Sequence, residues 1–327
     1  MKNVQKRNHT GRRYVFICGL HRSGTSVLGR NIARMENCTG FKDTGVIEDE
    51  GQFLQDVYPT AMTYGGAGRF GFDSRAHLTE TSVLFTPANA ARLRTSWHAY
   101  WDNSKTIFVE KTPGNLLKTR FLQAVFPDSY FIVIRRHPVA VSMANQRWKV
   151  SLAPLHSLFD HWLHCHALFD EDKKYLKHVY ELSYEDYVRD SDKYHEEIAA
   201  FIGTRVPENG MEKASPIYNQ KYLDRWHKLP AESPFRVYYR YLVRTYESRF
   251  SQYGYSLISG LPNGDEVLRE AGMIANVLGV LSCVAADTGA LMWRSALRCR
   301  VALRRAAKAI LPQLVIGKLR QLRTTEI

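Results

Sequence analysis

An eight-residue loop with the sequence GLHRSGTS, at residues 19–26, carries the clearest chemical signal in the chain. It follows a short apolar run and precedes a helical pattern, so its backbone N–H groups and the helix N-terminus can bind a phosphate. The glycine spacing is that of nucleoside-triphosphate loops, but Thr25 stands where those loops have a lysine, and Arg22 supplies the cation. Taken alone, the glycines also suit a tight turn. The phosphate-binding residues predicted here are Arg22, Ser23, Gly24, Thr25 and Ser26.

A second cationic motif, RRHP at residues 135–138, follows the apolar run YFIVI. Enzymes that process triphosphates place an acidic residue on a neighbouring strand to hold Mg²⁺. Arginines at that place indicate a second phosphate and no metal. Two phosphate sites without a metal suit a donor that carries a 5′-phosphosulfate and a separate 3′-phosphate. The alternative is a metal-dependent nucleotide kinase or triphosphatase, and the missing lysine and acid count against it.

An acidic residue after another apolar run is the candidate for acid–base chemistry. Residues 106–109 form a short predicted strand that is followed by Glu110, Lys111 and the dipeptide Thr-Pro. An acceptor hydroxyl, whose pKa lies far above neutral, needs a general base when it attacks. We expect Glu110 to take this proton and Lys111 to stabilise charge on the bridging oxygen, at the edge where open α/β sheets bind ligands. The alternative is an ordinary surface Glu–Lys pair.

Together these motifs resemble one enzyme family. HRSGTS and VIRRHP are similar to the 5′-phosphosulfate loop and the 3′-phosphate motif of sulfotransferases that use 3′-phosphoadenosine 5′-phosphosulfate (PAPS). VEKTPGN resembles the stretch that carries the catalytic glutamate in glycan-modifying members, and ELSYEDYVRD with EEIAAFIG resembles a later region of the family. The resemblance extends over about residues 13–255. It implies a P-loop-like α/β fold, and transfer of a sulfuryl group from PAPS to a hydroxyl-bearing acceptor, with a carbohydrate favoured.

The resemblance also implies roles for single residues. Arg22 corresponds to the cation that holds the bridging and 5′-phosphate oxygens, and Arg136 to the arginine that binds the 3′-phosphate. Glu110 corresponds to the catalytic base. The family has a serine eight residues after this arginine, where the chain has Ala144. Ser142 lies two residues earlier and is the candidate donor to the 3′-phosphate if the local register is shifted. Otherwise a different residue must supply this hydrogen bond.

The elements that must position these residues alternate along the chain. Short apolar runs bounded by turn residues alternate with helical patterns, which is typical of a parallel α/β sheet. Strands are expected at residues 14–18, 106–109, 130–134 and 179–182. Helices are expected at residues 26–35, 115–126, 138–148 and 192–202, with Gly203 as the C-terminal cap of the last. The predicted fold class is α/β, with a parallel sheet flanked by helices.

Departures from this alternation divide the chain. A basic tail covers residues 1–13, and the sulfotransferase-like domain covers residues 14–258. Within that domain, residues 40–104 contain a glycine-rich stretch and predict a long irregular insertion over the acceptor side of the active site. A basic helical extension is expected at residues 265–327.

The net charge of +13 lies in the two tails. Residues 1–13 carry five basic residues and no acid, and residues 290–327 carry nine against Glu326 alone, so the chain between them is neutral. This distribution indicates an anionic membrane surface through residues 290–327, and not a nucleic acid, as the partner. No oligomeric state is specified.

A helix over residues 291–311 would be amphipathic, as in helices that lie in a membrane interface. Its apolar face would hold Met292, Cys299, Leu303 and Ile310. Its basic face would hold Arg294, Arg298, Arg305 and Lys308. The uncharged run at residues 271–286 is shorter than the ~20 residues that a membrane span needs. A tail that packs on the domain, or is solvated, is the alternative.

Cysteine usage bears on the compartment. Five scattered cysteines without a C-x-x-C pair predict reduced thiols and a cytoplasmic location, peripheral to the membrane if the basic tail binds it. The apolar run that begins at Tyr14 is too short for a signal peptide, so no secretion signal is expected. A non-catalytic membrane-associated binding protein with the same fold is the remaining functional alternative.

Two further clusters have structural explanations. The histidines and the cysteine at residues 156–166 lie on an amphipathic helical pattern, where only His161 and Cys165 share a face, so no metal is expected. The aromatic residues Tyr218, Tyr222 and Trp226 follow a spacing of four. This spacing suits core packing, and stacking on an adenine is the alternative.

Overall fold

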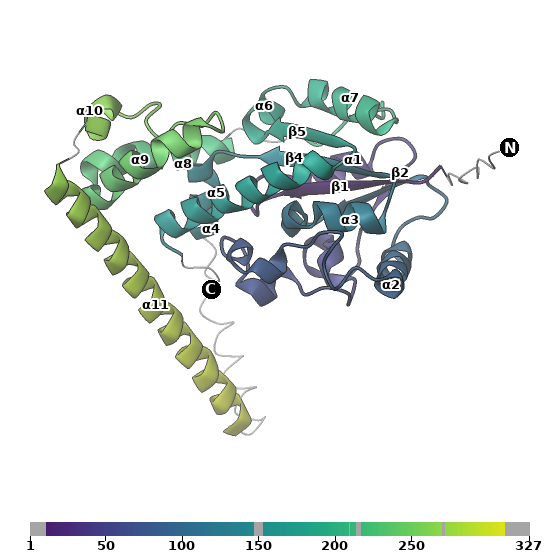
Figure 1. Ribbon diagram of the computed structural model, residues 1–327, viewed down its shortest axis with the longest axis horizontal. Coiled ribbons are helices and arrows are strands. Elements are labelled where there is room, and N and C mark those ends of the chain that lie inside the picture. The colour runs from purple at the N-terminus through teal and green to yellow at the C-terminus, as the bar shows by residue number, and fades with distance from the viewer. Residues whose placement is uncertain (1–10, 147–152, 209, 214–216, 270–271, 311–327) are drawn as a thin grey trace, which may run out of the picture.

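The computed structural model describes residues 11–146, 153–208, 210–213, 217–269 and 272–310. Its centre is a five-stranded sheet with the order β2-β3-β1-β4-β5, in which every neighbouring pair is parallel (Figure 1). The strands are β1 (Arg13–Gly19), β2 (Cys38–Gly40), β3 (Ile107–Lys111), β4 (Ser129–Arg135) and β5 (Val179–Ser183). The α/β fold class with a parallel sheet is therefore confirmed.

Helices connect and cover these strands. The α-helices are α1 (Thr25–Ala33), α2 (Pro87–His98), α3 (Thr119–Val125), α4 (Pro138–Gln146), α5 (Leu155–Asp172), α6 (Tyr184–Arg189), α7 (Ser191–Ile202), α8 (Ile217–Glu232), α9 (Arg236–Ser251), α10 (Gly264–Arg269) and α11 (Met273–Ile310). Short 3₁₀ turns are η1 (Ile47–Asp49), η2 (Gly51–Phe53), η3 (Ala61–Tyr64), η4 (Phe70–Phe72), η5 (Ser74–Ala76), η6 (Pro113–Leu117) and η7 (Lys173–Tyr175).

The strands are apolar because both faces of the sheet are covered. Alternate residues of β1 enter two different hydrophobic cores: Phe16 joins the one built with α2, α3 and α5, and Ile17 joins the one built with α1, α6 and α7. Figure 1 shows α6 and α7 on one side of the sheet and α2 and α3 on the other. The sheet edge at the carboxyl ends of the strands is left for ligands, as in other open α/β folds.

The expected strands are confirmed to within two residues, but the helix expected at residues 115–126 is wrong in part. A 3₁₀ turn over Pro113–Leu117 precedes α3, and Lys118 between them has φ −134° and ψ 12°, which is not helical. The three-residue strand β2 carries too short an apolar signal to be found from the sequence. The helix at residues 192–202 ends as expected, because Gly203 adopts φ 72° and the N–H of Thr204 bonds to the carbonyl of Ala199 at 2.8 Å.

The insertion at residues 40–104 is irregular only in its first part. It contains five 3₁₀ turns and then α2, which begins at an N-cap where Thr86 Oγ1 accepts the N–H of Asn89 at 3.1 Å. Trp97 of α2 is fully buried, and its Nε1 donates to the carbonyl of Gly51 at 3.0 Å. This bond ties the start of the insertion to its end.

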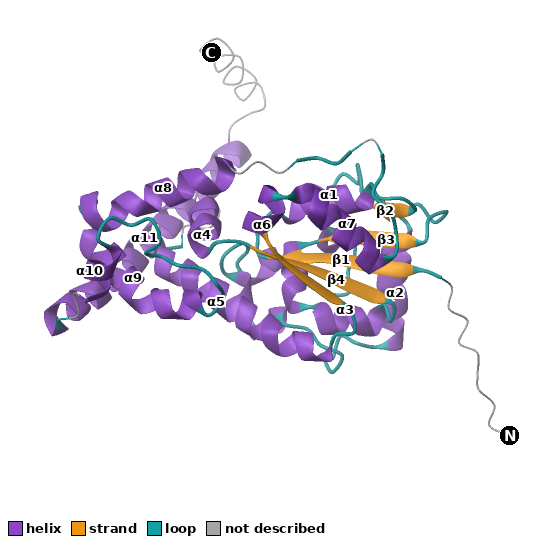
Figure 2. Ribbon diagram, turned by 90° about the horizontal axis from the view of Figure 1, so that it is seen from above, coloured by secondary structure: helices purple, strands orange, loops and turns teal. Residues whose placement is uncertain are grey.

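The helices after α7 extend the body beyond one end of the sheet, as Figure 2 shows for α8, α9 and α10. Trp226 is buried and donates to the carbonyl of Leu257 at 2.8 Å, so this aromatic residue packs in the core and is not open to an adenine. The side chain of Tyr218 lies outside the described residues. Val267 of α10 is buried in the same core, so packing continues past residue 264.

Candidate active site

The loop between β1 and α1 has positive φ at two residues that are separated by one without it. Arg22 has φ 73° and Gly24 has φ 97°, and the N–H of Ser23 bonds back to the carbonyl of Leu20 at 3.1 Å. Such alternation turns successive N–H groups toward one concave side and forms an anion site. Gly24 is the N-cap of α1 and provides no side chain to cap the first turn. The loop therefore leaves these donors for a phosphate or phosphosulfate.

The side chains of the predicted loop donors line this turn. Thr25 is buried, and Ser26 reaches the surface, where its Oγ lies 3.4 Å from Glu48 Oε2. Ser23 is fully buried, and no described residue forms a hydrogen bond with its Oγ. A buried hydroxyl without a partner is costly, so a ligand oxygen at the loop would satisfy it.

Gly24 is required for a steric reason as well as for its positive φ. A Cβ at this position would lie 2.6 Å from the ring of Tyr184, the first residue of α6. Gly24→Ala should therefore weaken nucleotide binding by tenfold or more and lower the melting temperature, because the left-handed backbone costs ~1–2 kcal/mol for alanine and the loop must also move. Calorimetric titration and a thermal melt measure both effects.

Gly45→Ala is the matched control for this substitution. Gly45 also has a positive φ, of 80°, but no described atom lies within 4 Å of its Cβ position. It should show only the backbone cost. Equal losses of nucleotide affinity in the two variants would contradict the loop assignment.

Arg136 lies against this loop, although it is distant in the sequence. Its Nη1 donates to the carbonyl of Arg22 at 2.7 Å, and its Nε donates to Asn219 Oδ1 of α8 at 3.0 Å. The guanidinium lies 4.3 Å from the centre of the Tyr184 ring. Burial lowers the pKa of Arg136 from its usual value, and the side chain is only 6% exposed. The structure thus brings Arg22 and Arg136, the two predicted phosphate cations, together.

Ser142, the predicted hydroxyl donor to the 3′-phosphate, lies on α4. Ser142 is 1% exposed, and within the described chain no hydrogen-bond partner satisfies its Oγ. Asn145 lies on the same helix, and its Nδ2 reaches the carbonyl of His21 in the loop at 3.5 Å. Asn145 and Asn219 are polar groups close to the two cations that the sequence motifs did not single out. What they share is their position, because each lies on a helix that packs beside the loop.

Glu110 is enclosed. Its Oε1 accepts the N–H of Gly51 at 2.9 Å and the hydroxyl of Thr112 at 2.5 Å, and its Oε2 accepts the amide of Asn115. The residue is 1% exposed, and burial raises its pKa to about 7. A carboxyl group with a pKa near neutral suits a general base. An acceptor hydroxyl reaches it only if the turn at Gly51 moves aside.

A buried lysine lies near this carboxylate. Lys118 is 2% exposed, its Nζ donates to the carbonyl of Gly114 at 3.2 Å, and burial lowers its pKa to about 8. It lies just before α3, where the sequence predicted uninterrupted helix. Lys118 is distinguished by its non-helical backbone and not by its residue type. The sequence pattern therefore did not identify it as a candidate site residue.

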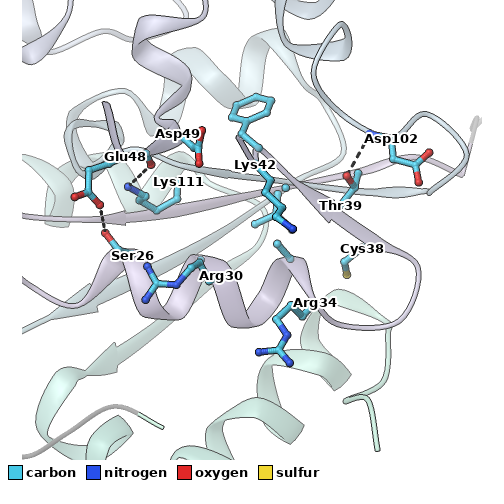
Figure 3. A pocket seen from close by; sticks show the side chains of 15 residues that line it. Ser26, Arg30, Arg34, Cys38, Thr39, Lys42, Glu48, Asp49, Asp102 and Lys111 are labelled. Atoms are coloured by element: carbon cyan, nitrogen blue, oxygen red, sulfur yellow. Dashed lines mark hydrogen bonds between the residues drawn. The ribbon is translucent and has the colours of Figure 1, made fainter. Parts of the chain in front are cut away.

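Lys111 points to the opposite face of the sheet from Glu110 and lines a cavity of about 570 Å³ beside α1 (Figure 3). Its Nζ donates to the carbonyl of Glu48 at 3.1 Å and to Glu50 Oε1 at 3.2 Å. Burial raises the pKa of Glu50 from its usual value. Ser26 lines the same cavity, so an acceptor bound there would lie beside the predicted phosphosulfate loop.

The backbone next to Lys111 is strained. Glu48 and Asp49 both have positive φ, 54° and 48°, although neither is glycine. Such conformations gather at functional sites, where the surrounding structure holds them. The insertion predicted to cover the acceptor side thus supplies the carboxylates nearest to Lys111.

The histidine cluster forms no metal site in the described chain. His161 accepts the N–H of Gly71 at 3.1 Å and lies 3.5 Å from Cys165 Sγ, so these two residues share a face as the spacing implied. Burial lowers the pKa of His161 to about 3 and raises that of the Cys165 thiol out of its usual range. Among the described residues, no group of three or more histidine, cysteine or acidic side chains converges as metal ligands do.

A sequence profile described as the sulfotransferase family matches residues 14–208, which is more than half of the chain. The chain belongs to the sulfotransferase family. The matched region holds the loop at residues 19–26, the Glu110–Lys111 pair and Arg136, whereas α8–α11 lie outside it. No curated protein matches this sulfotransferase in sequence.

Solved structures also resemble this sulfotransferase. The sulfotransferase domain from the Synechococcus PCC 7002 olefin synthase is 18% identical, with 68% of this chain and 91% of that chain covered and a TM-score of 0.44. The sulfotransferase domain from the curacin biosynthetic pathway is 15% identical, with 77% and 99% covered and a TM-score of 0.45. A sulfotransferase from Alicyclobacillus acidocaldarius is 17% identical, with 65% and 91% covered and a TM-score of 0.39.

Proposed function

We propose that this sulfotransferase transfers a sulfuryl group from PAPS to a hydroxyl group of a carbohydrate acceptor, without a metal. The observation that carries the proposal is the contact between Arg136 Nη1 and the carbonyl of Arg22. It joins two cationic sites at the carboxyl edge of the sheet, and their chemistry fits a donor that has phosphate groups at two separate positions.

On the donor side, the loop N–H groups and Arg22 would bind the 5′-phosphosulfate, and Arg136 with Asn219 would bind the 3′-phosphate. The acceptor oxygen attacks sulfur while the bond from sulfur to the bridging oxygen breaks. This gives a sulfate ester and 3′-phosphoadenosine 5′-phosphate (PAP). In a loose transition state of this kind, positioning and fixed positive charge supply most of the rate. With the donor bound in this way, Arg22 and the loop donors would lie where charge develops on the leaving phosphate.

On the acceptor side, the cavity beside α1 is the binding site that we propose. Lys111 lines it beside Ser26, and Arg34 and Lys42 line it farther from the loop (Figure 3). A cavity of about 570 Å³ is in the range of small-molecule sites and suits one or two sugar rings. Its lining combines cations with the acidic residues Glu48, Asp49 and Asp102, so it suits a polar acceptor that carries several hydroxyl groups.

Glu110 is the base that we propose for the acceptor proton. Because Glu110 does not line the cavity, this role requires the acceptor hydroxyl to extend past the end of β3 to the other face of the sheet. Its position at the end of β3 and its pKa near neutral support this role. Glu50 is the second candidate, because its carboxylate contacts Lys111, which lines the cavity. Either carboxylate would take the proton from the acceptor hydroxyl as the hydroxyl oxygen attacks sulfur, and would later release this proton to solvent.

Calorimetric titration of the full chain with PAP, ATP and ATP–Mg²⁺ tests the donor assignment. PAP should bind without metal and at least tenfold more tightly than either form of ATP, because only PAP carries a phosphate at the 3′ position. Tightest binding of ATP–Mg²⁺ would instead support a kinase or triphosphatase. Binding of none of the three would support a protein that kept the fold without catalysis.

A further inference from the structure

Of the described helices, α11 alone is long and apolar enough to cross a membrane by length and composition. The apolar part, Met273–Leu303, has a window with a mean hydropathy of 1.6, and 6% of that window is buried. A core helix of a soluble protein would be mostly buried, and a signal sequence would lie near the N-terminus. Neither explanation fits α11, whose first part lies beside α9 and α10 and whose remainder projects away from the body of the molecule (Figure 1).

One side of α11 is docked on the protein. Gly279 lies so close to α9 that a Cβ there would be 2.3 Å from the ring of Tyr241. Cys283 and Ala286 pack against the hydrophobic core, and Asp287 pairs with His156 at 3.2 Å. This packing fixes which side of the helix faces outward.

The opposite side is apolar and exposed over its whole length. We call it the bare face, and its members are Ile274, Val277, Leu281, Val284, Leu291 and Met292. Each of these side chains is more than half exposed. They recur at helical spacing and form one stripe without a charge. The exposed residues Cys299 and Leu303 extend this stripe, so the apolar face expected from Met292 onward continues a longer one.

Positive charge accompanies the distal part of the stripe. The sequence between residues 294 and 308 contains six arginines and lysines and no acid. Arg294 and Arg300 are described, whereas the side chains of Arg298, Arg305, Lys308 and Ile310, and residues 311–327, lie outside the described residues. An apolar stripe flanked by cations is the pattern of a helix that lies in the interface of an anionic bilayer.

We propose that the bare face of α11 lies in the interface of an anionic lipid bilayer, with the helix axis in the membrane plane. A spanning arrangement would draw Asp287 into hydrocarbon and break the contact of Gly279 with Tyr241. A second copy of the chain docked in parallel on the same face would place the two cationic segments next to each other. The in-plane arrangement keeps the contacts of α11 with Tyr241 and His156, and it brings the arginines and lysines close to anionic lipid headgroups.

Vesicle binding of the full chain tests this proposal. The protein should cosediment with vesicles of equimolar phosphatidylcholine and phosphatidylserine, and binding should weaken as salt rises, since screening weakens attraction to anionic lipid. The double variant Val277→Asp, Leu281→Asp should reduce partitioning by about a hundredfold, because two charges would enter the apolar layer. Both positions are exposed, so the fold should tolerate the change.

Val83→Asp is the matched control, because Val83 is 92% exposed but lies in the insertion, far from α11 along the chain. It should bind vesicles like the unchanged protein. Absence of vesicle binding, or equal loss in both variants, would overturn the proposal. So would a concentration-dependent dimer in sedimentation that the double variant abolishes, because a second copy would then cover the bare face. Retention on vesicles after a carbonate wash would show a spanning helix and overturn the in-plane arrangement.

Discussion

Glu110→Gln is expected to lower kcat by about 10²–10⁴-fold and to leave the Kd for PAP nearly unchanged. Glutamine keeps the size of the side chain but accepts no proton from the acceptor. Because burial raises the pKa of Glu110 to about 7, its ionised fraction increases as pH rises through neutral. The kcat of the unchanged enzyme should rise over the same interval, and this rise should be absent in the variant. Steady-state kinetics across pH with a carbohydrate acceptor measure both effects.

The environment of Glu110 requires a structural control. The carboxylate accepts three hydrogen bonds, from Gly51, Thr112 and Asn115, and a glutamine amide would turn a donor toward one of these donors. A loss of about 1–3 kcal/mol in stability is therefore expected with the variant. Asn115→Ala removes one of the three bonds but keeps the carboxylate, so it should affect stability more than kcat. Equal losses of kcat in both variants would show that Glu110 only holds the turn at Gly51.

Glu50→Gln separates the two candidate bases. If Glu110 is the base, this substitution should change kcat much less than Glu110→Gln, because it alters the contact with Lys111 at 3.2 Å and the hydrogen bond from Gln52 at 2.5 Å but leaves the Glu110 carboxylate in place. A large loss with Glu50→Gln and normal turnover with Glu110→Gln would move the base to the insertion. The acceptor hydroxyl would then react on the face of β3 that carries Lys111, and the hydrogen bond between Gly51 and Glu110 would not have to break.

Arg136→Ala is expected to weaken PAP binding by about 1.5–3 kcal/mol, which is roughly 10- to 150-fold. Affinity for adenosine 5′-phosphosulfate, which lacks the 3′-phosphate, should fall far less. The reason is that Arg136 is buried and stacks on Tyr184, so its charge is poorly screened by water. Calorimetric titration with the two nucleotides measures the difference.

The neighbouring arginine is a matched control for this experiment. Arg135 pairs with Asp170 at 2.6 Å and with Glu181 at 2.9 Å, so its charge is already balanced by the protein. Arg135→Ala should therefore leave the preference for PAP unchanged. Equal weakening of both nucleotides by Arg136→Ala would show that this residue supports the loop through the carbonyl of Arg22 and does not bind the 3′-phosphate.

Most of the sheet was predictable because its signals are local. The runs that became β1, β3, β4 and β5 are apolar over consecutive residues, as strands covered on both faces must be. Gly203 ends α7 because only glycine enters the left-handed region without strain. By contrast, Lys118 leaves the helical conformation in a stretch whose pattern continues as helix. The Lys118 side chain is buried, and packing around it interrupts the helix. No residue near it in the sequence is a signal for this interruption.

By itself, the sequence determined four features: the glycine loop at residues 19–26, the second arginine motif, the Glu110–Lys111 pair and the amphipathic character of the last helix. Residue type and spacing within a few positions set each of these. Only the tertiary structure decided which of them meet. Gly51 and Glu110 are 59 residues apart, and Arg22 and Arg136 are 114 apart, yet each pair is joined by a hydrogen bond. The same holds for α11, where contact with α9 determines which apolar side remains exposed. Burial and hydrogen-bond partners depend on segments far apart in the chain, and they determine which carboxylate is enclosed, which cation is paired and which surface can meet a membrane.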